Sequence, residues 1–179
     1  MTEAETIFEE INLGDMTGLK EIKDVLPAAS GVRVRIDKAT VKDNSFEGSV
    51  PTKKYLNLQL RIVDGISFVD ADGVAQTKYK NKVVFTNNKD LPVWVDTNHE
   101  FFKADKFVKG AYLIPLRQFL IACGCDPKAV KIDAGLLEAL KGVELEVDIA
   151  QNQKKSKTPE GEWIATGEME NLFRNWKKV

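Results

Sequence analysis

Residues 55–62 alternate polar and apolar side chains without a break. Leu56, Leu58, Leu60 and Ile62 fall on one side of this stretch, and Tyr55, Asn57, Gln59 and Arg61 fall on the other. Successive side chains of a β-strand point to opposite faces, so this period of two predicts a strand with one buried face. Such a strand needs partners in a sheet that covers a hydrophobic core.

Two more stretches, 31–37 and 143–149, show the same alternation. In the first of them the apolar phase then slips by one position, to Ala39 and Val41. A one-residue slip would turn the later side chains to the wrong face of the sheet unless the strand contains a bulge. A bulge that bends this strand is therefore expected.

Residues 79–86 and 163–172 are rich in strand-forming side chains and predict two further strands. The clearest helical pattern lies between them, at 112–123, where apolar residues recur at steps of three and four. Pro115 falls in the first turn of this helix, where proline is tolerated, and Gly124 follows its end. One helix is therefore expected among five strands.

The order of these elements is three strands, a helical section and two strands. That order is typical of an OB-fold, a five-stranded Greek-key barrel whose helix lies between strands three and four. We therefore predict a mainly β protein, with an OB-fold-like domain over 26–179 and an acidic N-terminal arm over 1–25. An open antiparallel α+β sheet has the same order of elements and stays as the alternative.

The formal net charge of −1 hides an uneven distribution along the chain. Residues 1–24 hold seven acids and two lysines, whereas residues 33–89 hold eleven basic residues and six acids. Residues 90–150 carry a net charge of −3, and residues 151–179 carry +2. Two separate basic stretches in a chain whose other segments are acidic indicate an anionic ligand that both stretches contact.

The sequence offers little for catalysis or metal binding. It contains no glycine-rich phosphate loop, nucleophile elbow or zinc-protease motif. His99 is the only histidine, and Cys123 and Cys125 are too close together for the usual zinc-binding pair. We therefore expect a protein that is not an enzyme and has no cofactor and no metal. Scattered acids such as Asp70 and Asp72 leave a metal-dependent nuclease as a third alternative.

In an OB-fold-like barrel, the outward face of the first two strands lies between the loops that join strands one to two and four to five. Polar, basic and aromatic residues on this face and these loops are the candidates for nucleic-acid contact: Arg33, Arg35, Lys42, Phe46, Lys53, Lys54, Tyr55, Asn57, Gln59, Arg61, Lys154, Lys155, Lys157 and Trp163. Cations follow phosphates and aromatic rings stack on unpaired bases, so the mixture favours a single-stranded nucleic acid. Phe46, Tyr55 and Trp163 are the stacking candidates.

Each candidate also has an ordinary structural explanation. Basic residues opposite a buried strand face occur on any solvated antiparallel sheet, and lysines in a loop at 151–161 are usually only solvated. Tyr55 could cover a neighbouring apolar residue, and Trp163 could plug one end of the barrel. Phe46 lies in the middle of a turn-rich loop with little core to enter, so its functional interpretation is the better of the three.

The layout resembles a family of phage and prophage proteins, long of unknown function, that look like OB-fold single-stranded DNA-binding proteins. The matching segments span about residues 26–175: Leu26-Pro27, Tyr55-Leu56-Asn57-Leu58 through Arg61-Ile62-Val63-Asp64-Gly65, Ala122-Cys123-Gly124, Lys141-Gly142-Val143-Glu144-Leu145 and Glu170-Asn171-Leu172-Phe173. The order and spacing of these segments carry the resemblance. It implies coating of single strands in phage replication or recombination, without a cofactor.

We therefore expect a phage-encoded protein that binds single-stranded DNA with little sequence specificity, with RNA as the alternative ligand. Replication or recombination proteins and a second copy of the chain are further candidate partners. The chain has no apolar run long enough for a membrane span and no signal peptide at Met1, which favours the cytoplasm, that of the host for a phage protein. The alternative is a phage structural or protein-interaction module with the same barrel and no nucleic acid.

The sequence departs from the family pattern at Val32, where many relatives have a tyrosine, and at the C-terminus. Many single-strand binding proteins end in an acidic tail, whereas this chain ends in Trp176-Lys177-Lys178-Val179. Residues 1–24 are acidic and could screen the basic face from the other end of the chain until DNA displaces them. Under this hypothesis, deletion of residues 1–24 tightens single-strand binding at low salt.

Overall fold

The structure is a computed structural model that describes residues 25–179. The predicted acidic arm, apart from Val25, lies outside the described residues. Within that range the fold is mainly β. Its strands are β1 (Ala29–Asp43), β2 (Lys53–Ile62), β3 (Ile66–Val69), β4 (Ala75–Lys78), β5 (Val83–Phe85), β6 (Pro92–Val95), β7 (Glu144–Lys157) and β8 (Trp163–Lys178). Its helices are η2 (Glu100–Phe102), α2 (Asp105–Val108), η3 (Ala111–Leu113), α3 (Ile114–Ala122) and α4 (Ala134–Ala139).

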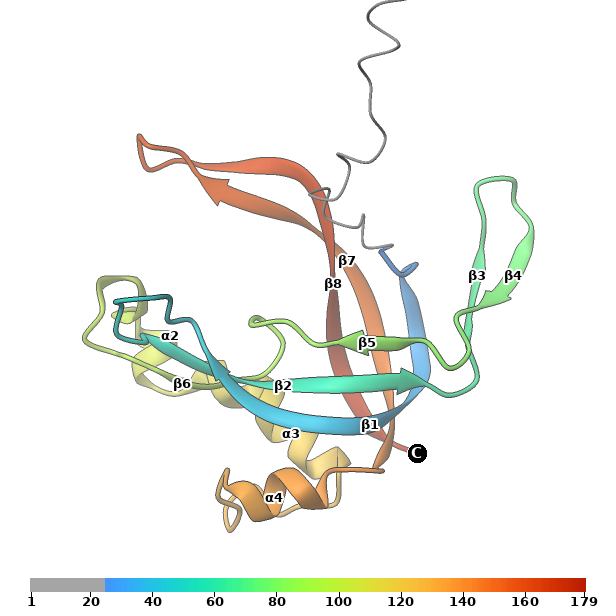
Figure 1. Ribbon diagram of the computed structural model, residues 1–179, viewed down its shortest axis with the longest axis horizontal. Coiled ribbons are helices and arrows are strands. Elements are labelled where there is room, and N and C mark those ends of the chain that lie inside the picture. The colour runs from blue at the N-terminus through green and yellow to red at the C-terminus, as the bar shows by residue number, and fades with distance from the viewer. Residues whose placement is uncertain (1–24) are drawn as a thin grey trace, which may run out of the picture.

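The main sheet is antiparallel and runs in the order β5-β2-β1-β7-β8, with β6 paired to β2 as well. The sheet curls into a half-barrel, with α3 and α4 at the end opposite the tip of the β7–β8 hairpin (Figure 1). Strand β8 ends this order, so one of its edges has no strand partner among the described residues.

The alternation predicted for the first two strands is confirmed. Leu56, Leu58, Leu60 and Ile62 are fully buried. The predicted bulge is also present, because the pairing of β1 with β2 shifts register between Ile36 and Lys38. The extra residue is Asp37, and the bulge keeps Ala39 on the buried face after the slip. The long, bent β1 can therefore pair with β2 along one part and with β7 along another.

The strand predicted at 79–86 is reduced to the three residues of β5. Tyr79 and Asn81 have positive φ angles of 71° and 64°, so the chain turns sharply before β5 and cannot be extended there. Strands β5 and β6 then follow the same edge of β2, opposite Gln59 to Arg61 and opposite Lys53 to Tyr55 respectively. The residues between these two short strands leave the ladder.

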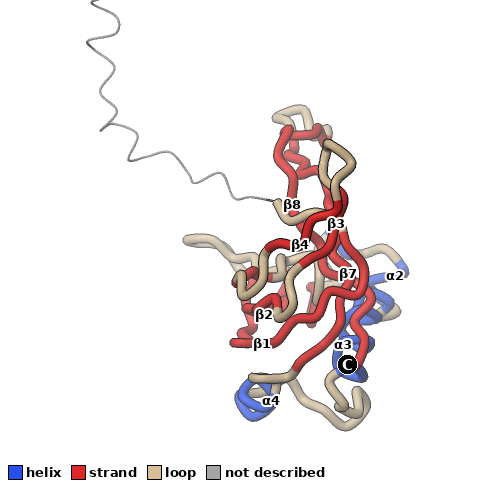
Figure 2. Tube along the Cα trace, turned by 90° about the vertical axis from the view of Figure 1, so that its right-hand side faces the viewer, coloured by secondary structure: helices blue, strands red, loops and turns tan. Residues whose placement is uncertain are grey.

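A second, unpredicted sheet consists of the β3–β4 hairpin, which projects from one side of the molecule (Figures 1 and 2). Gly65 begins it with φ +86°, and a Cβ at this position would lie 2.9 Å from the backbone oxygen of Lys78. The backbone at residue 65 passes so close to the backbone of Lys78 that this position requires glycine.

The loop predicted at 151–161 is mostly strand. Strand β7 continues to Lys157, the turn occupies only residues 158–162, and β8 starts at Trp163. The outer part of this hairpin projects beyond the rest of the sheet (Figures 1 and 2). Lys154, Lys155 and Lys157 consequently lie on a two-stranded ribbon, not in a loop as the sequence suggested.

The predicted helix is confirmed as η3 and α3. Pro115 lies in its first turn, and Gly124 follows it with φ +81°. Phe119 of α3 is fully buried and packs edge-on against Trp176 of β8, with ring centroids 5.2 Å apart. The register of β7 with β8 shifts beside this contact, and Asn175 takes a positive φ of 55°. The bulge lets the buried Trp176 contact α3 and close one end of the core.

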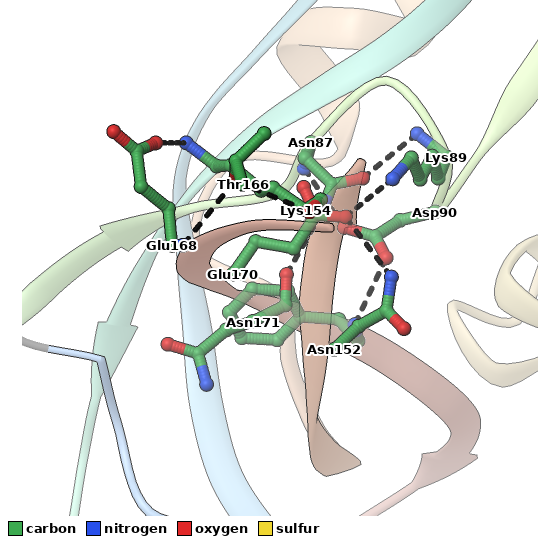
Figure 3. A network of polar contacts seen from close by, with 10 residues as sticks. Asn87, Lys89, Asp90, Asn152, Lys154, Thr166, Glu168, Glu170 and Asn171 are labelled. Carbon is green, nitrogen blue, oxygen red and sulfur yellow. Dashed lines mark hydrogen bonds and ion pairs between the residues drawn. The ribbon is translucent and has the colours of Figure 1, made fainter. Parts of the chain in front are cut away.

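Side chains, not a backbone ladder, join the open ends of the sheet. The residues between β5 and β6 reach β8, where the Asn87 amide donates to the Asn171 carbonyl at 2.8 Å (Figure 3). The Asp90 carboxylate accepts from the backbone N–H groups of Phe173 at 2.9 Å and of Asn87 at 2.8 Å. Lys89 forms an ion pair with Glu170 beside them. The half-barrel is thus held closed by four polar residues.

Candidate nucleic-acid interface

The outer face of the main sheet is the face turned away from the core. Residues directly opposite each other in neighbouring strands lie on the same face. Two rows of residues cross β1, β2 and β5 on this outer face: Lys38, Gln59 and Phe85 form one, and Arg35, Arg61 and Val83 form the other. This surface is where the sequence predicted nucleic-acid contacts.

The three arginines predicted on this face are engaged with carboxylates. Arg33 donates to Glu144 at 2.5 Å, and this hydrogen bond and the charge of Glu144 raise the pKa of Arg33. Arg61 Nη2 lies 2.8 Å from the carboxylate of Asp37, and Arg35 Nε lies 3.4 Å from the same carboxylate. The part of the outer face that holds the arginines therefore carries both positive and negative side chains, and its potential is less positive than the sequence suggested.

Asn57 does not belong to the accessible surface. Although it alternates with the core residues of β2, it is buried, and its amide donates to the Thr86 carbonyl at 2.6 Å. The Thr86 hydroxyl in turn accepts from the backbone N–H of Leu58 at 2.8 Å. Asn57 therefore fixes the chain after β5 against β2, and the prediction that it contacts a ligand is corrected.

Phe85 is the aromatic residue that sequence reasoning missed. It lies in the row of Lys38 and Gln59, and 58% of its surface is exposed. Three consecutive apolar residues, Val83 to Phe85, hide the strand period, so the sequence alone does not show which of them faces outward. Gln59 lies directly opposite Phe85, and Tyr55 lies further along β2 on the same strand face; both are half-buried.

The loop between β1 and β2 presents Phe46, which is 78% exposed. Its backbone N–H donates to the Ser49 hydroxyl at 2.8 Å, and its carbonyl accepts from the Ser49 N–H at 2.9 Å. Asn44 anchors the base of the loop by accepting from the N–H groups of Thr52 and Lys53. Hydrogen bonds within the loop therefore fix the turn that carries Phe46, and the exposed ring lies outside the core, as the sequence suggested.

The lysines at this end of the sheet differ in their surroundings. Lys42 is exposed at the end of β1. Lys53 is half-buried, and burial, followed by the charge of Lys89, lowers the pKa of its ammonium group. The ammonium group of Lys54 lies 5.6 Å from the ring centre of Trp94, opposite it on β6. Trp94 is 40% exposed, so it adds an aromatic surface that the sequence did not indicate.

The outer β7–β8 ribbon gathers the second basic group. Lys157 lies directly opposite Trp163, and Lys155 lies opposite Ala165, so the two lysines and Trp163 share one face. Trp163 is 60% exposed, and the alternative that it plugs the barrel is therefore wrong. Lys154 forms an ion pair with Glu168 at 3.3 Å, which leaves Lys155 and Lys157 without a carboxylate partner among residues 25–179.

No metal-binding cluster accompanies this surface in the described part of the chain. Residues 25–179 contain no group of three or more His, Cys, Asp and Glu side chains that could hold a metal ion. His99 caps η2, because its Nδ1 accepts from the Phe101 N–H at 3.2 Å. Burial raises the pKa of the Cys123 thiol to about 12, so this thiol is a poor nucleophile.

None of the helices within residues 25–179 is both long enough and apolar enough to cross a membrane. No protein-family model, curated protein or solved structure matches this chain. Its function is therefore inferred from the geometry described above.

Proposed function

We propose that this protein binds single-stranded DNA without catalysing a reaction. In this proposal it is a phage-encoded, OB-fold-like protein that coats single strands in the host cytoplasm during replication or recombination. It needs no cofactor, and RNA is a second possible ligand. Replication or recombination proteins and a second copy of the chain are its candidate partners.

The observation that carries the proposal is the row formed by Lys38, Gln59 and Phe85. Phe85 lies at the end of the edge strand β5 and is 58% exposed, so its ring is available to a ligand. A cation and an amide lie beside it on the same face. Stacking of a base on the ring, with a phosphate near the lysine, uses all three side chains.

The sheet order supports the OB-fold part of the proposal. An OB-fold barrel places strand one between strands two and four, with strand three beside two and strand five beside four. The observed order β5-β2-β1-β7-β8 matches this arrangement if β5 and β6 together count as the third strand. The helices between β6 and β7 then occupy the position of the helical section.

The β1–β2 loop and the β7–β8 ribbon, on either side of the outer face, also present exposed aromatic rings near lysines. Phe46 lies on the loop between β1 and β2, and Trp163 lies beside Lys155 and Lys157 on the β7–β8 ribbon. In OB-folds these two connections flank the face that receives the strand. A single strand that crosses the sheet can therefore meet rings and cations along its whole path.

The test is a fluorescence-anisotropy titration of a labelled thirty-nucleotide poly-thymidine strand at low and moderate salt, with a duplex of equal length as the control. The proposal expects binding that prefers the single strand and weakens steeply as salt rises, since bound counterions are released. Absence of binding at low salt, or equal binding to the duplex, would contradict it.

The alternative is a phage structural or protein-interaction module with the same fold. It is favoured by one observation, which is that Arg33, Arg35 and Arg61 are all engaged with carboxylates. A surface of paired charges suits a protein partner, whose binding depends less on salt than that of a nucleic acid. The salt dependence of any complex therefore separates the two functions.

A further inference from the structure

The bulge in β1 places an acid among the basic residues of the outer face. Arg35 lies opposite Arg61 of β2. Lys38 lies opposite Gln59, the preceding outer-face residue of β2. Asp37 is the extra residue between Arg35 and Lys38, and its carboxylate contacts both arginines. An acid repels phosphates, so its place in the middle of this surface needs an explanation.

Arg61 is fully engaged by its neighbours. Its Nε donates to Oδ2 of Asp37 at 2.9 Å, and its Nη2 lies 2.8 Å from the same oxygen. The remaining nitrogen, Nη1, donates to the carbonyl of Asn81 at 3.2 Å. Arg61 therefore joins β2 to the bulge in β1 and to the turn before β5, and none of its nitrogens is left for a ligand.

Arg33 is engaged by a different acid. Its Nε and Nη2 both donate to Oε2 of Glu144, at 3.0 and 2.5 Å. Its Nη1 lies 4.0 Å from the carboxylate of Asp64. Glu144 is also the residue directly opposite Arg35 on β7, but the ion pair that it forms is with Arg33. Glu144 therefore does not occupy the guanidinium group of Arg35.

Arg35 differs from the other two arginines because only its Nε is bonded. This nitrogen donates at 3.4 Å to Oδ1 of Asp37, the carboxylate oxygen that Arg61 leaves free. Nη1 and Nη2 of Arg35 form no hydrogen bond or ion pair with residues 25–179, and 44% of the side chain is exposed. A guanidinium group held at Nε still presents N–H donors on both terminal nitrogens, which suit the oxygens of a phosphate.

We propose that Arg35 binds a backbone phosphate next to the one near Lys38, and that Asp37 is the positioning residue that holds the Arg35 guanidinium group for this contact. The inference rests on the proposed function, because the phosphate belongs to the single-stranded nucleic acid. Lys38 is the next outer-face position of β1 and lies in the row of Phe85, where a base stacks. Restraint of the long Arg35 side chain before binding lowers the entropy that it loses on binding.

Positioning and charge predict opposite effects for a change at Asp37. Asp37→Asn removes a negative charge from the face, and this alone would tighten the binding of an anion. The same change leaves one amide oxygen, for which Arg61 and Arg35 compete, so Arg35 loses its restraint. Positioning therefore predicts weaker binding in spite of the lost acid.

The experiment titrates the labelled thirty-nucleotide poly-thymidine strand with wild type and variants at several salt concentrations. Arg35→Gln is expected to lower the slope of log K against log salt by about 0.7, as for one phosphate contact. Asp37→Asn is expected to raise the Kd about threefold. The double variant Asp37→Asn with Arg35→Gln should bind as Arg35→Gln alone does, because both changes remove one contact.

Two control variants separate positioning from charge and from folding. Glu144→Gln removes an equal charge from the same face but leaves the bond between Arg35 and Asp37, so it is not expected to weaken binding. Arg61→Gln removes the contacts around the bulge but leaves Asp37 free to hold Arg35, so the salt slope should stay unchanged. If the bulge mattered only for folding, Arg61→Gln would weaken binding at least as much as Asp37→Asn.

Three results would overturn the proposal while the wild type still binds the single strand. The first is tighter binding by Asp37→Asn, which the lost charge alone predicts. The second is an equal loss of salt slope in Arg61→Gln and Arg35→Gln. The third is additive weakening in the double variant, which would mean that Asp37 does not act through Arg35. A wild type that does not bind poly-thymidine at low salt would instead remove the proposed function, and this inference with it.

Discussion

The carboxylate of Asp90 accepts a hydrogen bond from the backbone N–H of Phe173 at 2.9 Å. Phe173 lies on the last strand of the sheet, and Asp90 lies in the segment that has left the β2 edge. A buried side chain thus replaces the carbonyl that a neighbouring strand would otherwise supply. The closure of the half-barrel consequently depends on a group that can take up a proton.

The stability of the protein should therefore depend on the ionisation of Asp90. Burial raises the pKa of its carboxyl group to about 6, although the N–H groups of Asn87 and Phe173 oppose the shift. A pKa above the unfolded value of 3.8 means that the folded state binds this proton more tightly. The Asp90 contribution to the free energy of unfolding is fully present below about pH 4 and is lost as the pH rises through about 6.

The measurement is urea unfolding of the wild type and of Asp90→Asn at several pH values between about 4 and 8. The variant loses one of two acceptors, which costs about 1 to 3 kcal/mol. The gap between the two proteins should widen by up to about 3 kcal/mol toward the acidic end, since only the wild type gains the proton. Parallel pH profiles would show that Asp90 titrates as an ordinary surface acid.

The sequence could not reveal this closure. Alternation at 55–62 and the phase slip after residue 37 are local patterns, and both predicted what the structure has: a half-buried strand and a bulge. Asn87 and Asp90 lie in a polar stretch whose apolar residues follow neither the strand nor the helix period. Their role arises only because the fold brings β8, more than 80 residues away, to face them.

Replacement of Phe85 should weaken single-strand binding. A stacked base is worth about 1 to 3 kcal/mol, so Phe85→Ala is expected to raise the Kd for poly-thymidine about tenfold. The control is Phe101→Ala, because Phe101 is similarly exposed at 62% but lies in η2 among the helices. If both variants bind as the wild type does, bases do not stack on the outer face.

The basic residues of the outer face should divide into two groups. Lys38 forms no ion pair among the described residues, so Lys38→Gln should lower the slope of log K against log salt by about 0.7, as expected for one phosphate contact. Arg33 is held by Glu144, so Arg33→Gln should leave this slope unchanged. Titrations of both variants at several salt concentrations check this, and an equal loss of slope would show that the Glu144 pair opens for DNA.

Strand phase places several of the candidate residues on the solvated face, but it does not show which of them are paired or buried. Residue type and strand phase correctly placed Arg33 on a solvated face, but its partner Glu144 lies 111 residues further along the chain. Asn57 shows the opposite error, since a polar residue in the outward phase is covered by the chain after β5. Pairings of this kind depend on tertiary register, which one sequence does not contain.

The turn at Gly65 should be more sensitive to substitution than the other hairpin glycine. Gly65 and Gly73 both have positive φ, but only at Gly65 would a Cβ meet a backbone oxygen, at 2.9 Å. Gly65→Ala is expected to destabilise the protein by about 1 to 3 kcal/mol, and Gly73→Ala by about 1 kcal/mol. Thermal unfolding of the two variants compares them directly, and equal losses would mean that only the φ angle matters at Gly65.

The two faces of the β7–β8 ribbon should differ in their contribution to DNA binding. Trp163 shares one face with Lys155 and Lys157, whereas its neighbour Ile164 lies on the other face opposite Ser156. The two side chains are similarly exposed, so nonspecific loss of apolar surface affects both variants alike.

Trp163→Ala should raise the Kd for poly-thymidine about tenfold, because it removes a base-stacking ring beside two cations. Ile164→Ala should change it by less than about twofold, since an aliphatic side chain offers a base no π-face for stacking. Anisotropy titrations at one salt concentration measure both effects. Equal weakening would mean that the ribbon contacts a partner through its apolar surface, as the protein-interaction alternative requires.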